Sequence, residues 1–323
     1  MANETTGRPS KNERRNLARE QARLAREQEK KREKRNRLFL QGGIAVGVLA
    51  VLAVIALILT QTMKPAGPGP ENMASGGAIF TKDLQVIPTP ALESGADRVA
   101  PEVDRKSLPL DVTVYVDYMC PACGAFEQQY GSMLENYVGS GDVDLQVYPL
   151  NFLDGQSLGS KYSTRAANLF ACVVEDQPDK AFTLHNRLLS KEVQPQEGTS
   201  GLSNEQLLEQ AKDSGVDVND EIKQCVKDVR FGSFISANYK TVSEVGIQGL
   251  AKGAQVVNNP QTGELQAAGG PQLLRSTPTV IVNGQQWVSN RDGDLEAYLL
   301  KVKGEIEQNS NKDKKSETAT KSE

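Results

Sequence analysis

Two closely spaced cysteines offer the most distinctive chemistry in this sequence. Cys120 and Cys123 lie in the segment VYVDYMCPACGAFEQQY, with Pro121 and Ala122 between them. A Cys-x-x-Cys pair can be a redox couple, half of a metal site or a small structural bridge. The remaining cysteines and the elements around the pair have to discriminate between these three.

The supply of further ligands argues against a metal site. The chain has two other cysteines, Cys172 and Cys225, and a single histidine, His185. A structural zinc site usually takes four Cys or His ligands, often as two close pairs, and only one close pair exists here. We therefore expect no metal and no other cofactor. A purely structural bridge within the pair is also disfavoured, because closing so short a loop stabilises little.

The predicted elements around the pair agree with redox chemistry. Residues 110–118, LDVTVYVDY, alternate apolar and polar side chains, which predicts a strand. From Cys120 to Tyr137 the apolar residues recur at helical spacing. The pair therefore lies at a helix N-terminus, where the dipole and unpaired N–H groups stabilise a thiolate and lower its pKa. Pro121 suits the first helical turn, since it has no N–H to leave unpaired.

The rest of the chain after this helix alternates between strand and helix patterns. The order of elements predicts an α/β sheet interrupted by an all-helical insertion. The expected elements are a strand at 143–150, the insertion at about 158–245 with a capping box at Ser203–Gln206, a strand hairpin at 277–288 that turns at Asn283–Gly284, and an amphipathic helix at 294–308.

An uncharged apolar segment near the N-terminus predicts a membrane anchor. Residues 38–60 contain 23 residues without a charge. As a helix they would span about 35 Å, enough for a bilayer core of about 30 Å. The preceding residues 1–37 carry a net charge of +7, which leaves −11 for the rest of the chain. The positive-inside rule then places the N-terminus in the cytoplasm and the remainder outside, in an oxidising compartment. A cleaved signal peptide is the alternative, but its apolar core would be shorter.

Composition sets the expected domain boundaries. Residues 61–77 are rich in Pro and Gly and predict a flexible linker, and the polar residues 309–323 predict a disordered tail. The folded domain is then 78–308. We expect the basic arm to act as a topology determinant with no nucleic-acid partner, because it lacks interleaved aromatic residues.

The other two cysteines predict a structural disulfide. Cys172 and Cys225 both lie in apolar-periodic segments of the helical block, and the predicted compartment is oxidising. Two buried free thiols are the alternative.

Three segments together carry a resemblance to a known family. CPACGAFE, the helical block and TPTVIVNG resemble the DsbA-like thiol–disulfide oxidoreductases of the thioredoxin fold, over about residues 78–308. The anchor resembles that of the membrane-tethered members. The resemblance implies that Cys120 attacks and Cys123 resolves, and that Thr277 and Pro278 face the pair through a cis peptide bond. It also implies exported unfolded or reduced proteins as substrates, and a DsbB-like or vitamin K epoxide reductase-like membrane protein as reoxidase.

The sequence departs from this family at two positions near the pair. Ala122 stands where the best-known members have His, which implies a less oxidising couple. Val114 stands six residues before Cys120, where many relatives carry a buried acid. Asp117, three residues before Cys120, could assist proton transfer, but we expect a solvated side chain at this strand end, since most Asp residues are exposed.

Several interpretations stay open. The same fold supports a reductase or an isomerase, and an anchored binding or chaperone module would carry the pair only for structure. We expect Trp287 to pack in the core or at its rim and His185 to be a surface or packing residue. The Gly/Gln/Asn-rich loop at 248–275 could rim a peptide groove or be a long insertion without such a role.

Overall fold

The computed structural model describes residues 23, 26, 30–32, 67–101 and 103–320. The residues from Ala66 to Glu323 form one compact unit. The predicted anchor at 38–60 and most of the basic arm lie outside the described residues. In the part of the chain that is described, no helix has both the length and the apolar character to cross a membrane.

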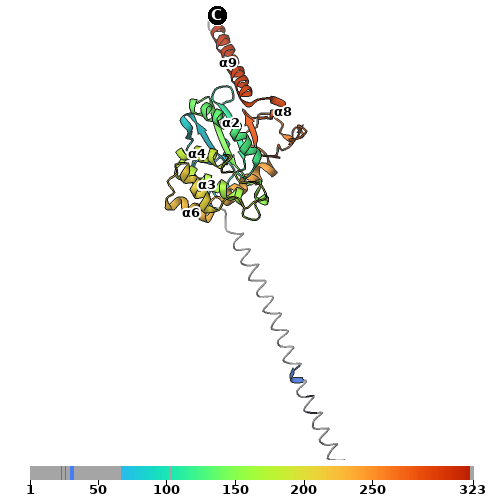
Figure 1. Ribbon diagram of the computed structural model, residues 1–323. Helices are drawn as coiled ribbons and strands as arrows, with labels where there is room; N and C mark the ends of the chain where they lie inside the picture. The colour runs from blue at the N-terminus through green and yellow to red at the C-terminus, as the bar shows by residue number, and fades with distance from the viewer. Residues whose placement is uncertain (1–22, 24–25, 27–29, 33–66, 102, 321–323) are drawn as a thin grey trace, which may run out of the picture. The chain divides into compact units, whose positions relative to one another are not determined.

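A mixed six-stranded sheet, in the order β2-β1-β4-β3-β7-β8, forms the centre of this unit (Figure 1). Strand β3 pairs in parallel with β4, to which a crossover helix connects it, and antiparallel with β7. The predicted strands are present. The bounds are β1 Ala78–Thr81, β2 Gln85–Val86, β3 Leu110–Val116, β4 Val143–Pro149, β7 Thr279–Val282 and β8 Gln285–Trp287.

Strands β1 and β2 were absent from the sequence prediction. They contain only four and two residues, too few to show an alternating pattern. Strand β1 pairs antiparallel with β4, so the order in the sheet is set by contacts distant in sequence.

The predicted turn of the last hairpin is confirmed. Asn283 and Gly284 have φ angles of +47° and +78°, the left-handed region that a two-residue hairpin turn needs. The Asn283 side chain also accepts a hydrogen bond from the backbone N–H of Asp111 at 2.8 Å, which ties the turn to β3.

The helical insertion between β4 and β7 is confirmed as well. Its helices α3, α4 and α6 pack together (Figure 1), and a disulfide between Cys172 on α3 and Cys225 on α6 joins two of them, as predicted. The Ser203–Gln206 capping box is present at the start of α5. The helical bounds are η1 Lys82–Leu84, α2 Pro121–Ser140, η2 Asp154–Gln156, α3 Tyr162–Asp176, α4 Pro178–Leu188, α5 Asn204–Asp213, α6 Asp220–Asp228, α7 Gly232–Lys240, the π-helix η3 Thr241–Val245, α8 Ser289–Asp292 and α9 Leu295–Thr320.

Both faces of the sheet are covered by apolar side chains. Val112, Val114 and Val116 of β3 belong to the main core with α2 and α3. Tyr115 and Ile281 belong to a second core on the other face. Strand β3 is therefore buried on both sides, which its alternating sequence did not reveal.

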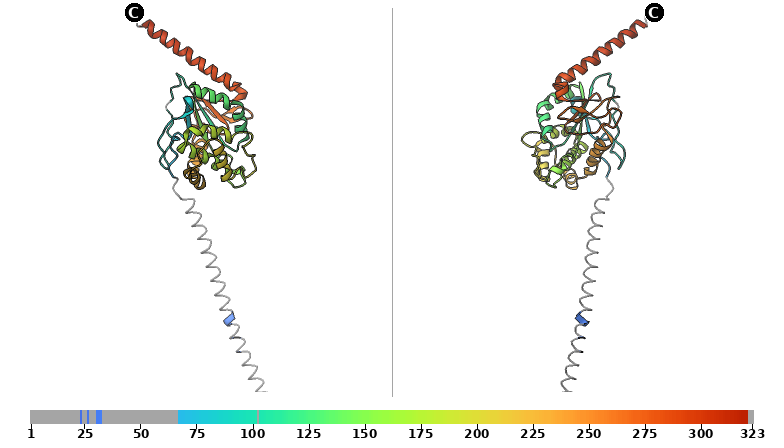
Figure 2. Two further views of the ribbon diagram at one scale, coloured as in Figure 1. Left: turned by 60° about the vertical axis from the view of Figure 1, so that its left-hand side comes forward. Right: turned by 90° about the vertical axis from the view of Figure 1, so that its right-hand side faces the viewer.

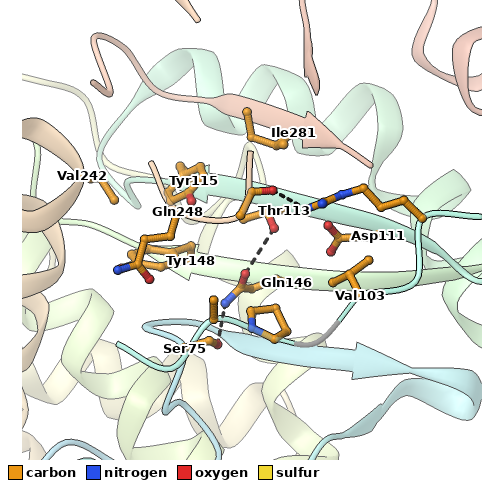
Figure 3. A pocket seen from close by; sticks show the side chains of 14 residues that line it. Ser75, Val103, Asp111, Thr113, Tyr115, Gln146, Tyr148, Val242, Gln248 and Ile281 are labelled. Atoms are coloured by element: carbon orange, nitrogen blue, oxygen red, sulfur yellow. Dashed lines mark hydrogen bonds between the residues drawn. The ribbon is translucent and has the colours of Figure 1, made fainter. Parts of the chain in front are cut away.

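The expectation of a flexible linker up to residue 77 is wrong for the residues described. Met73 is fully buried, and the side chain of Asn72 donates a hydrogen bond to the carbonyl oxygen of Val174 at 3.0 Å. Ser75 accepts a hydrogen bond from the side chain of Gln146 at 2.6 Å, and Gln146 accepts one from Thr113 (Figure 3). Gly76 closes a turn here, since its backbone N–H donates to the carbonyl oxygen of Met73 at 2.8 Å, and the segment packs against the domain.

The same three side chains line a small polar cavity on the second face of the sheet. Figure 3 shows the side chains that line it. Its volume of about 30 Å³ matches roughly one water molecule. Asp111 also faces this cavity, and burial raises the pKa of its carboxyl to about 6.

The predicted boundary after residue 308 also differs from the structure. Helix α9 continues to Thr320, where a disordered tail was expected, and it extends away from the rest of the domain (Figure 2). No Pro or Gly follows Gly304 within this helix, and its Lys, Glu and Ala residues favour helical structure.

The loop at 248–275 contains a short hairpin, β5 Val257–Asn259 and β6 Glu264–Leu265. One glutamine side chain ties the loop to β8, and another links two parts of the loop to each other. Gln286 of β8 accepts a hydrogen bond from the backbone N–H of Val257 at 2.7 Å, and Gln266 donates to the carbonyl oxygen of Leu273 at 2.6 Å.

Candidate active site

Cys120 caps the N-terminus of α2, directly after the connection from β3. Its φ and ψ of −75° and 115° are non-helical, and Pro121 occupies the first helical turn. The backbone N–H of Cys120 donates to the carbonyl oxygen of Asp117 at 3.0 Å, which closes the turn that links strand and helix. The predicted position of the pair at a strand-to-helix junction is therefore confirmed.

Both thiols are buried, but their surroundings shift their pKa values in opposite directions. Cys120 is 7% exposed and Cys123 is fully buried. The pKa of Cys120 is lowered to about 6, chiefly because the Cys123 thiol donates a hydrogen bond to it; the backbone N–H groups of Cys123 and Ala122 add to the effect. Burial raises the pKa of Cys123 well above its ordinary value. At neutral pH a thiolate therefore forms at Cys120 in preference to Cys123.

The loop before β7 lies beside Cys120. The peptide bond between Thr277 and Pro278 is cis, as the resemblance implied. The Sγ of Cys120 lies 3.3 Å from the carbonyl oxygen of Thr277. Residues 157 positions apart are thus brought together at the same end of the sheet.

The expectation of a solvated Asp117 is wrong, because its side chain is fully buried. The carboxylate accepts hydrogen bonds from the backbone N–H of Met119 at 2.8 Å, the backbone N–H of Leu153 at 2.8 Å and the hydroxyl of Ser163 at 2.7 Å. Leu153, in the loop after β4, and Ser163, on α3, cover this end of the strand. The sequence around Asp117 does not indicate that these distant residues lie there.

Burial raises the pKa of the Asp117 carboxyl to about 7, against the opposing effect of its three hydrogen bonds. Its Oδ1 accepts two of these bonds and its Oδ2 only one, which leaves a lone pair of Oδ2 for a proton. A carboxyl group with this pKa can give or take a proton near neutral pH.

His185 belongs to a buried cluster next to the pair and not to the surface. Its Nδ1 lies 3.2 Å from the hydroxyl of Tyr118, and its Nε2 lies 3.4 Å from a carboxylate oxygen of Glu127 on α2. The histidine is 2% exposed and packs against the rings of Phe170 and Phe182. It is therefore a packing residue that ties α4 to α2.

A groove with a volume of about 320 Å³ runs beside the active-site motif. Trp287 at 8% exposure forms part of its floor, as expected for a residue at the core rim, and its ring lies 5.6 Å from that of Tyr130. The indole N–H of Trp287 and the hydroxyl of Thr277 are buried without a hydrogen-bond partner. The lining residues are all uncharged: Ala122, Ala125, Phe126, Gln129, Tyr130, Val257, Pro260, Ser276, Pro278, Val280, Gln286, Trp287, Val288 and Ser289.

The loop at 248–275 thus contributes to the groove, through Val257 and Pro260. Of the two interpretations of this loop, the structure agrees with the one in which it rims a groove. Within the described residues, no group of three or more His, Cys, Asp or Glu side chains could hold a metal ion.

The fold and the site define a thioredoxin-like protein, with a Cys-x-x-Cys pair at the N-terminus of the helix that follows a central strand. A family model described as thioredoxin matches residues 106–268, half of the chain. The chain belongs to the thioredoxin family.

Similar proteins of known name fall into two groups. The first is the serine/threonine-protein kinase PknE of Mycobacterium tuberculosis, 31% identical over 93 residues, which are 28% of this chain and 16% of the kinase. The chain therefore spans only a small part of this curated relative.

The second group consists of solved structures. Reduced DsbA from Mycobacterium tuberculosis is 22% identical, with a TM-score of 0.46, over 72% of this chain and 99% of that one. Oxidised BdbD from Bacillus subtilis is 18% identical, with a TM-score of 0.47, over 75% of this chain and 100% of that one. Reduced DsbG from Mycobacterium tuberculosis is 22% identical, with a TM-score of 0.45, over 71% of this chain and 94% of that one.

Proposed function

We propose that this protein is a membrane-anchored thiol–disulfide oxidoreductase that introduces disulfides into exported proteins through Cys120 and Cys123. The observation that carries the proposal is the unequal environment of the two thiols. Cys120 is 7% exposed with a lowered pKa of about 6, and Cys123 is fully buried with a raised pKa. A redox couple that exchanges disulfides with proteins needs one accessible, stable thiolate and one protected partner.

The reaction starts from the oxidised pair. A substrate thiolate attacks the Sγ of Cys120, the bond between Cys120 and Cys123 breaks, and a mixed disulfide between substrate and Cys120 forms. Cys123 leaves as a thiolate and takes up a proton, because its burial disfavours the charge. We propose the Asp117 carboxyl as the source of this proton, because its pKa is about 7 and its charge acts on the Cys123 thiol.

The second step releases the substrate. Another substrate thiolate attacks the substrate sulfur of the mixed disulfide, and Cys120 leaves as the thiolate that its environment stabilises. A lower pKa makes a better leaving group, so this step gains from the same hydrogen bonds that lower the pKa of Cys120. The pair keeps two electrons, and we propose that a DsbB-like or vitamin K epoxide reductase-like membrane protein removes them.

The uncharged groove beside Cys120 supports an unfolded protein as substrate. Its floor of Phe126, Tyr130 and Trp287 suits an apolar side chain near the reacting cysteine. Such side chains are accessible in an unfolded or reduced exported protein and become buried once it folds.

Two features support a location outside the cytoplasm. The uncharged segment at 38–60 follows a strongly basic arm, as in an anchor with a cytoplasmic N-terminus. The disulfide between Cys172 and Cys225 agrees with an oxidising compartment.

The decisive experiment has two parts, both on the full-length protein in detergent. Equilibration of the pair with reduced and oxidised glutathione gives its reduction potential, and a peptide with two thiols gives the rate of disulfide formation. An oxidase shows a potential well above that of a structural disulfide and oxidises the peptide stoichiometrically. A strongly reducing potential would favour a reductase, and no reaction with the peptide would favour a binding or chaperone module.

A further inference from the structure

We infer that Gln194, in the loop between α4 and α5, is a positioning residue that sets the reactivity of Cys120. The loop belongs to the helical insertion, and Gln194 lies 74 positions after Cys120 in the sequence. The inference deepens the proposed function, because it assigns to the insertion a direct influence on the reacting thiol.

The side chain of Gln194 donates to two backbone carbonyl groups around the nucleophile. Its Nε2 lies 2.8 Å from the carbonyl oxygen of Cys120 and 3.4 Å from that of Tyr118. The loop holds Gln194 in this place, since its backbone N–H donates to the carbonyl oxygen of Ser190 at 2.9 Å and the neighbouring Val193 packs against the main core.

The first turn of α2 is shaped to receive this amide group. A Cβ atom added to Gly124 would lie 2.1 Å from the Oε1 of Gln194. The absence of a side chain at Gly124 therefore allows the amide of Gln194 to lie against the helix. Gln194 of the insertion therefore packs against the first turn of α2, where Gly124 follows Cys123.

The contact affects the charge around the Sγ of Cys120. Carbonyl oxygens are the negative ends of peptide dipoles, and those of Tyr118 and Cys120 lie next to the thiol in the chain. The N–H groups of Gln194 place partial positive charge against both oxygens. Without them the surroundings of Cys120 are more negative, and a thiolate is less stable there.

The first test is the titration of Cys120 in the reduced, full-length protein. The pKa is read from the rate of alkylation by iodoacetamide as a function of pH. Gln194→Ala should raise the pKa of Cys120 by about half to one unit, the worth of one hydrogen bond. The equilibrium with glutathione should move toward the oxidised pair by about three- to tenfold. Gln194→Glu should raise the pKa further, because it places a carboxylate against two carbonyl oxygens.

The matched control is Gln196→Ala. Gln196 lies two residues away in the same loop and its side chain is exposed. The Gln196→Ala substitution should leave the pKa of Cys120 unchanged. The midpoint of urea unfolding, followed by the fluorescence of the single Trp287, shows for each variant whether the fold is intact.

A double-mutant cycle with Gly124→Ala separates the contact from a general loss of packing. The methyl group would displace the flexible amide of Gln194, while Ala favours the helix more than Gly does. Gly124→Ala alone should therefore raise the pKa of Cys120 as Gln194→Ala does, with no loss of stability. The double variant should show about the same rise as each single variant, because all three lack the same contact.

An unchanged Cys120 pKa in Gln194→Ala would overturn the inference, and so would additive shifts in the double variant. These outcomes are independent of the proposed function. The pKa of Cys120 responds to Gln194 or does not, whether or not the protein oxidises a peptide. Failure of peptide oxidation with an intact response to Gln194 would refute the proposed function alone.

Discussion

The backbone N–H of Asp117 lies 3.5 Å from the Sγ of Cys123, and neither residue's side chain is exposed to solvent. A buried carboxyl and a buried thiol are thus neighbours behind the reacting cysteine. Burial raises the pKa of both the Asp117 carboxyl and the Cys123 thiol. The protonated, uncharged forms of these two groups are therefore favoured more than usual near neutral pH.

The raised pKa of Asp117 makes stability depend on pH in a predictable direction. An Asp in the unfolded chain titrates near pH 3.9, whereas Asp117 in the folded protein titrates at about 7. Between these values the unfolded state loses the proton and the folded state keeps it. The free energy of unfolding should therefore fall as pH rises from 4 to 7, by up to about 4 kcal/mol.

Asp117→Asn should lose this dependence, because Asn does not titrate. The measurement is urea unfolding at pH 4, 5.5 and 7, followed by the fluorescence of Trp287. Asp111, whose pKa is about 6, and Cys120 contribute slopes in both proteins, so it is the difference between the two curves that reports the titration of Asp117. Asn also offers fewer acceptors to the three donors, which lowers stability by an amount that does not vary with pH. Parallel curves for the two proteins would show that Asp117 does not titrate in this range.

Cys120 and Cys123 should differ in reactivity. At pH 6.5 iodoacetamide should modify Cys120 rapidly and Cys123 barely, because Cys120 carries the lowered pKa and is 7% exposed, whereas Cys123 is fully buried. Cells that express Cys123→Ser should accumulate mixed disulfides with exported proteins, visible as bands that disappear on reduction. Equal accumulation with Cys120→Ser would contradict the assignment of the nucleophile.

Loss of the disulfide between Cys172 and Cys225 should destabilise the domain without changing the chemistry. The bridge closes a loop of 53 residues, for which the chain-entropy model gives about 4 kcal/mol. We expect the double variant Cys172→Ser/Cys225→Ser to unfold at lower urea concentration. The pKa of Cys120 should stay the same in the folded protein. A shift of that pKa would mean that the bridge also shapes the active site.

The proposed topology can be tested in intact cells. A protease added to cells whose wall has been removed should digest the domain from residue 67 onward and spare the basic arm at 1–37. The expectation follows from the uncharged segment at 38–60 and its basic flank. Protection of the domain until the membrane is dissolved would place it on the cytoplasmic side.

The sequence predicts those features whose signals are local. The alternation before Cys120 and the helical spacing after it locate the strand-to-helix junction, and Asn283–Gly284 marks a turn with positive φ angles. The functional residues that were missed depend on contacts distant in sequence. Asp117 is buried by Leu153 and Ser163, and Gln194 reaches Cys120 from the insertion. The only feature of the local sequence that indicates the contact between Gly124 and Gln194 is the presence of a glycine within a helical pattern.

The complete burial of Cys123 also determines how the site withstands oxidative damage. Peroxide has to reach a sulfur to oxidise it, so it attacks Cys120 and converts the thiolate to a sulfenic acid. Cys123 lies within hydrogen-bond reach of Cys120 and can displace hydroxide from it, forming the disulfide and releasing water. The product is the Cys120–Cys123 disulfide from which the proposed reaction starts. Oxidation by peroxide, which would inactivate a lone thiol, therefore returns this site to its active, oxidised form.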